Sequence, residues 1–287
     1  MVKLTFSTTG CWDLADGFGC ASLGLPGVCD NNTSLVLDYD KKLQGIVLAG
    51  KYETVLQQAS QISEQVHAAI VLFGNAGGEN RFLSRLQVLF SCPMVGGGAA
   101  CDFATGRSGL ITGGGEVAVL LITDSRYTYE AVTECIHDRI LEDCSVTMED
   151  ARTIRLINGI DASVYLEQWK KKLALAQTDF EHLTLSDEQN INAHLSCEDG
   201  KIKSGRDLRE KMILRYVAHE CVYERMSAFY DDPDAIVFGC AGLSGLLDRP
   251  LNTPSFGLFL FGEVCHVDGV SEFGNLMLSK LVIRSKV

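Results

Sequence analysis

The sequence has little proline, little positive charge and no long apolar run. Only 5 of its 287 residues are proline whereas 28 are glycine, so we expect glycine to form the tight turns and close backbone approaches. Lys and Arg total 25 against 37 for Asp and Glu, and the net charge of −12 disfavours a nucleic-acid partner. The longest apolar runs, such as Val117–Ile122, are strand-sized and far shorter than the ~20 residues that span a bilayer, so we expect no membrane association.

Several signatures of enzymes and metalloproteins are also missing. The sequence contains no P-loop and no G-x-S-x-G nucleophile elbow. Gly17-Phe18-Gly19 does not complete a dinucleotide motif, because Ser22 stands where the third glycine belongs. No two cysteines have the C-x2-4-C spacing typical of structural zinc sites. We therefore expect no cofactor, no metal and no catalytic residue.

The cysteines indicate a reducing compartment. There are eleven, an odd number, spread from Cys11 to Cys265 in a chain long enough to form a sizeable core without disulfides. We interpret them as reduced thiols of a cytoplasmic protein, where they serve mainly as small buried hydrophobic side chains.

Hydropathy patterns predict strands alternating with helices. Continuous apolar runs at 68–73 and 117–122 are typical of strands buried on both faces. Apolar residues at three- and four-residue steps predict helices at 51–66, 81–90, 127–141, 162–176 and 207–230. Further strands are expected at 34–39, 45–49, 145–148, 153–157, 235–240, 256–261 and 276–283.

These elements predict an α/β (α+β) fold in which mixed β-sheets are layered with helices in two lobes. The length suits two domains at ~150 residues each. We place the boundary at the polar stretch that begins near Thr178, giving lobes of residues 1–177 and 178–287. Residues 11–33, rich in Gly, Asp, Asn and Cys, are expected to form a long irregular connection.

The last fifty residues carry three motifs in succession. An apolar strand ends in Phe238-Gly239-Cys240, a second segment reads Gly257-Leu258-Phe259-Leu260-Phe261-Gly262-Glu263, and a third reads Phe273-Gly274-Asn275. This arrangement resembles the C-terminal part of the FIST (F-box and intracellular signal transduction) domain family. The chain has Leu243 where that family often has Arg, and Gly274 where it has His.

Weaker similarities extend the resemblance toward the N-terminus. The segments 95–98, 116–123 and 153–167, the last containing Asn158-Gly159, are similar to the N-terminal part of the same family. The resemblance implies a stand-alone intracellular sensory domain, with residues 1–177 as the N-like lobe and 178–287 as the C-like lobe. It also implies a small ligand, such as an amino acid, and supplies no catalytic residue.

Glu263 and a triple glycine are the first candidates for ligand contact. Glu263 follows an apolar strand, where an unpaired carboxylate is costly to bury, so it suits a ligand ammonium group, Arg249 or local backbone N–H groups. Gly96, Gly97 and Gly98 follow an apolar pair and can bring backbone N–H groups close to a carboxylate. A plain tight turn explains the same three glycines.

Cys240, Gly242 and Asn275 complete the candidate ligand-binding set. Cys240 ends a strand, so it suits either a pocket wall or a nucleophile, and Gly242 follows two residues later. Asn275 can form several hydrogen bonds, either with a ligand or with the backbone around it.

The function predicted from these residues is that of a sensor, not an enzyme. A small ligand would lie between the lobes, with its carboxylate at Gly96–Gly98 and its ammonium group at Glu263, and the resulting conformational change would reach a protein signalling partner. One alternative is a cysteine-dependent hydrolase or acyl transferase, with Cys240 as nucleophile, His266 as base and Glu263 orienting it. The other is a scaffold that binds proteins and no small molecule.

Overall fold

The structure is a computed structural model of the chain. It describes residues 2–8, 18–22, 36–38, 43–74, 77–99, 101–102, 107–108, 110, 115–176, 180–252 and 254–286. Most of the irregular connection expected at residues 11–33 lies outside these ranges.

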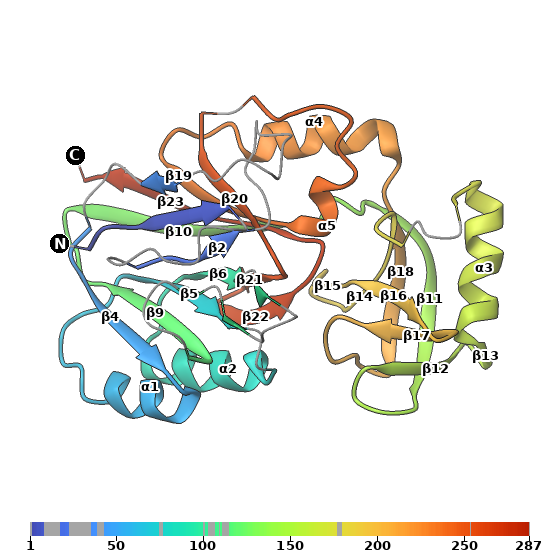
Figure 1. The fold of residues 1–287 in the computed structure, drawn as a ribbon, viewed down its shortest axis with the longest axis horizontal. Coiled ribbons are helices and arrows are strands. Elements are labelled where there is room, and N and C mark those ends of the chain that lie inside the picture. Colours follow the sequence, from blue (N-terminus) through green and yellow to red (C-terminus); the bar gives the residue numbers. More distant parts are fainter. Residues whose placement is uncertain are drawn as a thin grey trace.

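The larger of two lobes, here called the core lobe, contains two facing β-sheets between two layers of helices (Figure 1). Helices α1 (Tyr52–Ala59) and α2 (Glu79–Leu89) cover one sheet, and α4 (His219–Phe229) and α5 (Ala241–Ser244) cover the other. The first sheet has the order β22–β21–β6–β5–β9–β4, with strands Val270–Gly274, Glu263–Val267, Met94–Gly98, Ala68–Phe73, Val117–Ile122 and Gly45–Gly50. The second has the order β10–β23–β19–β20, with strands Tyr127–Glu134, Leu278–Ser285, Ala235–Cys240 and Phe256–Leu260.

Two smaller groups of strands also belong to the core lobe. The first pairs in the order β2–β1–β3, with strands Ala21–Ser22, Thr5–Thr8 and Val36–Asp38. The second pairs β7 (Cys101–Asp102) with β8 (Arg107–Ser108). Leu4 and Phe6 pack into the apolar core between the two large sheets, so the first of these groups helps to close that core.

The small lobe is one continuous segment, residues 139–216, inserted between β10 and α4. Its strands follow the order β15–β14–β18–β11–β12–β17–β16, namely Asn192–Ala193, Leu183–Ser186, Lys211–Tyr216, Arg139–Met148, Thr153–Ile157, Lys201–Ser204 and Leu195–Glu198, with β13 (Ile160–Asp161) paired to β12. Helix α3 (Ala162–Leu173) packs on this sheet through Tyr165 and Leu166. The helix begins at Asp161, whose side chain accepts hydrogen bonds from the Ser163 and Val164 amides.

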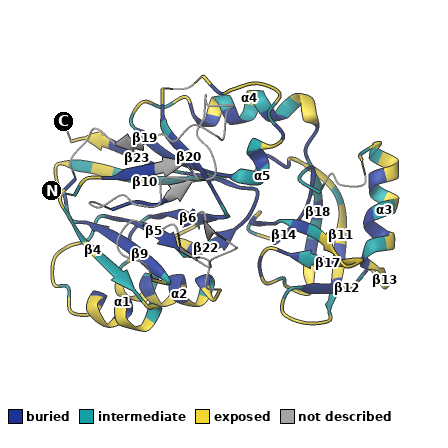
Figure 2. Ribbon diagram, in the orientation of Figure 1, coloured by how far each residue is buried: buried dark blue, intermediate teal, exposed yellow. Residues whose placement is uncertain are grey.

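The apolar core of the core lobe lies between its two large sheets, with one further apolar layer under each pair of helices. Ile70 and Leu120 of the first sheet face Phe238 and Leu258 of the second, all fully buried. Figure 2 shows these central strands buried and the outer faces of the helices exposed. The apolar runs at 68–73 and 117–122 are the strands β5 and β9, and both parallel and antiparallel pairs occur. The predicted α/β class of mixed sheets layered with helices is confirmed.

Two predicted helices are wrong. The segment 127–141 forms strand β10 and the start of β11, because Tyr127, Tyr129 and Ala131 alternate onto the core face with a period of two. The segment 207–230 is divided into strand β18 and helix α4, because Met212 and Leu214 alternate inward before the helical spacing begins. In both segments the spacing of the aromatic and aliphatic residues fits the helical period as well as the strand period, so the pattern does not distinguish the two structures.

The predicted turn at Gly96–Gly98 is also wrong, because these glycines form the end of strand β6. They pair with β5 on one side, and Gly96 and Gly97 pair with β21 on the other. A Cβ on Gly97 would overlap the carbonyl oxygen of Gly262. The glycines therefore allow a close backbone approach within a sheet and do not form an anion cradle.

The boundary predicted at residues 177/178 does not separate the sheets. Strand β10 pairs with β23, and β6 pairs with β21, so segments from both sides of that boundary share each large sheet. The structural division instead sets residues 139–216 apart from the rest.

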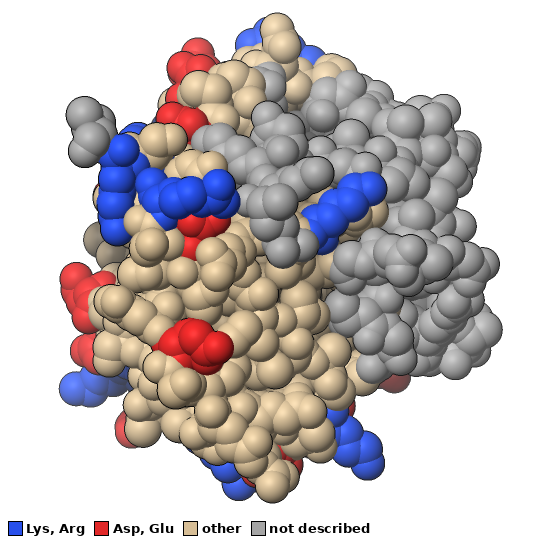
Figure 3. Space-filling view, turned by 90° about the vertical axis from the view of Figure 1, so that its left-hand side faces the viewer, with Lys and Arg blue, Asp and Glu red and all other residues tan. Residues whose placement is uncertain are grey.

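Among the described residues, charged side chains are sparse at the end of the core lobe farthest from the small lobe. Figure 3 shows described Lys and Arg side chains there interspersed with acidic side chains and uncharged surface. Among the described residues, no helix is both long and apolar enough to cross a membrane.

We expect Gly97→Ala to destabilise the fold, because its methyl group would displace backbone at the β6–β21 junction. Overpacking of this kind costs roughly 1–3 kcal/mol, and backbone that cannot rotate away places this site at the upper end. Urea unfolding measures the loss. Gly245→Ala is the control, since its backbone is helical and its Cβ would make only a 3.5 Å contact. Equal urea midpoints for the two variants would contradict the close backbone contact between Gly97 and Gly262.

Candidate functional site

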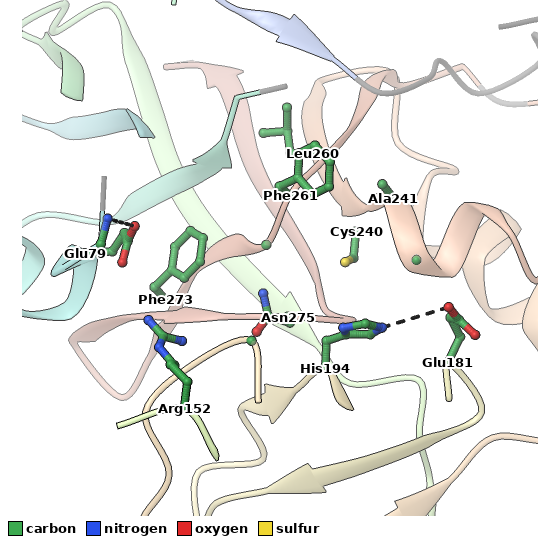
Figure 4. A pocket seen from close by; sticks show the side chains of 14 residues that line it. Glu79, Arg152, Glu181, His194, Cys240, Ala241, Leu260, Phe261, Phe273 and Asn275 are labelled. Carbon is green, nitrogen blue, oxygen red and sulfur yellow. Dashed lines mark hydrogen bonds and ion pairs between the residues drawn. The ribbon is translucent and has the colours of Figure 1, made fainter. Parts of the chain in front are cut away.

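A cavity of about 540 Å³ lies where the two lobes meet (Figure 4). Its volume is within the ~300–1,000 Å³ typical of small-molecule sites. The core lobe contributes Gly77, Glu79, Cys240, Ala241, Gly242, Leu260, Phe261, Gly262, Phe273 and Asn275, and the small lobe contributes Arg152, Glu181, His194 and Gly205. We call it the interlobe cavity.

Most of the lining residues stand at the ends of strands. Cys240 to Gly242 join β19 to α5, and Leu260 to Gly262 join β20 to β21. Arg152 precedes β12, and Gly205 follows β17. Strands from two sheets and two lobes therefore end around one space, and their connecting segments form its wall.

Asn275 carries the most unusual polar group in this wall. The residue is 9 % exposed, and its Oδ1 is buried without a hydrogen-bond partner in the part of the chain that the structure describes. A Cβ on Gly205 of the small lobe would overlap that Oδ1, and a Cβ on Gly262 would lie 2.7 Å from Nδ2. The side-chain amide is thus wedged between the lobes, with Oδ1 packed against Gly205 and Nδ2 against Gly262.

Backbone and side-chain hydrogen bonds from the small lobe hold Asn275 in place. The backbone N–H of Asn275 donates to the Asn192 carbonyl oxygen at 3.0 Å, and Asn192 Nδ2 donates to the Leu276 carbonyl oxygen at 3.1 Å. The Arg206 and Arg209 guanidinium groups contact Glu272 of β22 at 3.2 and 3.1 Å. These bonds fix the lobes against one another and orient the Asn275 segment.

Charged groups occupy both ends of the cavity. In the view of Figure 4, Glu79 and Arg152 lie at one end, Asn275 near the middle, and His194 with Glu181 at the other end. Glu79 is 8 % exposed and accepts a hydrogen bond from the Gly77 amide at 3.0 Å.

The two charged pairs that involve small-lobe residues of the cavity have longer distances. Arg152 Nε lies 3.4 Å from Asp207 Oδ1, and His194 Nε2 lies 3.9 Å from Glu181 Oε1. The neighbouring His194 imidazole lowers the pKa of Glu181. A ligand can therefore meet both charge signs without separating a tight buried ion pair.

Glu263 lies behind the cavity wall, not in it. It is fully buried on β21, where Oε2 accepts the Met277 amide at 3.2 Å and Oε1 has no hydrogen-bond partner of acceptable geometry in the described part of the chain. Burial raises the pKa of its carboxyl well above the usual range. Burial thus favours the neutral acid, which does not suit the predicted contact with an ammonium group.

The Cys240 thiol is buried beside Glu263. The residue is 6 % exposed and lines the cavity. Burial, and then the neighbouring Glu263, raises the pKa of this thiol. Reactive cysteines have a lowered pKa, so Cys240 fits a pocket wall better than a nucleophile.

The structure separates the predicted site residues into two groups. Cys240, Gly242 and Asn275 line the interlobe cavity. Gly97 and Glu263 are cross-strand neighbours, but neither they nor Gly96 and Gly98 line it. The predicted assignment of the ligand carboxylate to Gly96–Gly98 is wrong because those residues belong to the interior of a sheet.

His266 does not reach Cys240. Its Nδ1 is 2.8 Å from Ser271 Oγ, which donates to Gln87 of α2. The imidazole is therefore engaged on the helix side of the sheet, and the predicted Cys240–His266 dyad is wrong.

Sequence reasoning missed the charged residues of the cavity. Glu79, Arg152, Glu181 and His194 come from separate segments, and none belongs to a recognisable motif. Only the meeting of the two lobes brings them together. The available signal was that His194 stands in a polar stretch between two strands.

Comparisons with known proteins add no assignment. The chain matches no model of a known protein family. A search of curated proteins likewise finds no significant match.

We expect Glu263→Gln to flatten the pH dependence of stability. The folded chain retains a proton that the unfolded chain releases near pH ~4.3, so the free energy of unfolding falls as pH rises above that value, by up to about 1.4 kcal/mol per unit. The amide variant cannot lose that proton. Urea unfolding from pH 4 to 8 measures the slope, with Glu198→Gln on exposed β16 as control. A slope unchanged by Glu263→Gln would contradict a buried neutral acid.

We expect Cys240 to be alkylated by iodoacetamide near pH 7.5 at least ~10-fold more slowly than exposed Cys197, because the thiolate reacts and burial suppresses it. Mass spectrometry of each cysteine-containing peptide gives the two rates. Fast labelling of Cys240 in the folded chain would instead favour the hydrolase.

Proposed function

We propose that the protein is a cytoplasmic sensor whose interlobe cavity binds a small zwitterion such as an amino acid. The observation that carries this proposal is a cavity of about 540 Å³ that both lobes line and that presents the Glu79 carboxylate and the Arg152 guanidinium group. A space of this size with a few polar groups is typical of small-molecule sites.

The charges around Asn275 support a zwitterion. A ligand ammonium group fits the Glu79 carboxylate of the core lobe, and a ligand carboxylate fits Arg152 of the small lobe. These groups replace Glu263 and Gly96–Gly98 in the assignment made from the sequence. Leu260, Phe261 and Phe273 provide apolar surface for the remainder of the molecule.

A ligand that contacts both lobes can change the arrangement of the lobes. It favours the lobe arrangement in which both sets of contacts form, and a protein partner would read that arrangement. The proposal also agrees with the function implied by the FIST resemblance, and eight cysteines between Cys20 and Cys265 are free thiols.

One observation supports the alternative of a cysteine hydrolase. Cys240 lines the same cavity as His194, and Glu181 stands beside that imidazole. The raised pKa of Cys240 opposes this alternative, so we favour a binding protein over an enzyme. The scaffold alternative requires that no small molecule bind.

We expect a panel of amino acids to contain at least one that raises the melting temperature. A ligand at 100 times its Kd adds about 2.7 kcal/mol to the stability of the folded chain. Glu79→Gln, of similar volume but without the negative charge, should weaken binding roughly tenfold or more. Isothermal titration measures both affinities, and Ser84→Trp on the exposed side of α2 is the control. If no compound stabilises the protein, the scaffold alternative is favoured.

A further inference from the structure

A second cavity, of about 830 Å³, lies in the small lobe between helix α3 and strands β16 and β17. It is lined by Ser163, Leu166, Glu167, Lys171, Phe180, Glu181, His194, Leu195, Ser196, Cys197, Gly200 and Ile202. We call it the small-lobe groove. Glu181 and His194 line both the groove and the interlobe cavity, so the two spaces meet at this pair.

The groove has an apolar floor and a charged rim. Leu166 and Ile202 are almost completely buried and form part of the floor beside Phe180. The Lys170 ammonium group lies 3.3 Å from the centre of the Phe180 ring, a cation–π contact that fixes the ring. Lys171 adds a positive charge on the exposed side.

The His194–Glu181 pair divides the spaces without sealing them. Its 3.9 Å separation exceeds a hydrogen bond, and each side chain is 33 % exposed. Such a partly exposed pair contributes little stability, so its side chains can turn aside for a ligand. A molecule longer than one amino acid would therefore pass from one space into the other at this pair.

We propose that the ligand is a short peptide of two or three residues whose amino-terminal residue occupies the interlobe cavity and whose second side chain, an apolar one, occupies the small-lobe groove. This inference rests on the proposed function and extends it. The amino-terminal ammonium group keeps the place given above, at Glu79, and Arg152 donates to the first peptide carbonyl. The carboxylate of the second residue meets His194 and Lys171 at the rim of the groove.

The size and chemistry of the combined site favour a peptide over a free amino acid. The interlobe cavity alone matches the volume range of drug-sized ligands, and the groove adds a larger space next to it. Charged groups occur at the far end, at the shared pair and at the groove rim, whereas the surfaces between them are apolar. That alternation suits a chain with charged ends and an apolar side chain.

The test uses the full chain and three probes, which are L-leucine, L-leucyl-L-leucine and N-acetyl-L-leucyl-L-leucine, in isothermal titration. We expect the dipeptide to bind at least ~10-fold more tightly than leucine, because a second leucine side chain leaves water. We expect acetylation to abolish most of that affinity, because it removes the ammonium group.

Variants then locate the second side chain. Ser196→Trp fills the half-buried wall of the groove and should reduce dipeptide affinity to that of leucine, leaving leucine binding unchanged. Cys197→Trp, at an exposed position of the same groove, provides a second block if the first variant folds poorly. Ser84→Trp, outside both cavities, should change neither affinity.

The outcomes distinguish this inference from the proposed function. Equal affinities for leucine and the dipeptide, or dipeptide affinity unaffected by both groove variants, overturn the peptide and leave the sensor of a single amino acid standing. Tight binding of the acetylated dipeptide also overturns the placement of the ammonium group. If none of the probes binds but another amino acid of the panel does, this inference fails and the proposed function stands. If no amino acid of the panel binds either, both fail.

Discussion

The close approach of strands β6 and β21 is the constraint on which the rest of the structure depends. Gly97 and Glu263 pair across it, and Gly262 presses against Gly97 so closely that no side chain fits. This junction joins the first and last parts of the chain into one sheet. It also fixes where the turn after β20 and the segment after β22 emerge, and those two segments carry Gly262 and Asn275 to the cavity.

The sequence predicts the interior of the core lobe well, because burial on both faces leaves an unambiguous pattern. Runs such as Ala68–Phe73 contain no polar residue, and only a central strand explains them at that length. Half-buried segments are harder to assign to a helix or a strand from the sequence. In 127–134, tyrosines and alanine fit a helical stripe as well as a strand, and only pairing with β23 decides.

The candidate site shows the same difference between residues that a local sequence pattern reveals and residues that only the tertiary structure brings together. Cys240, Gly242 and Asn275 were recognisable because they stand at the ends of apolar strands, where ligands usually bind. Glu263 stands out for the same reason, yet one position along a strand decides whether a side chain faces a cavity or a core. Arg152, Glu181 and His194 could not be found, since their proximity to Asn275 arises from the docking of a lobe that local patterns do not describe.

The insertion of the small lobe into the core lobe affects the order in which the chain can fold during synthesis. Among the described strands, those of residues 139–216 pair only with one another, and they form an apolar cluster of their own, so this unit can condense as soon as it leaves the ribosome. The sheets of the core lobe must wait, because β10 gains its partner only when β23 is translated, and β6, already paired with β5, keeps one open edge until β21 follows. Such distant pairings slow folding and leave strand edges of the nascent first half exposed in the meantime.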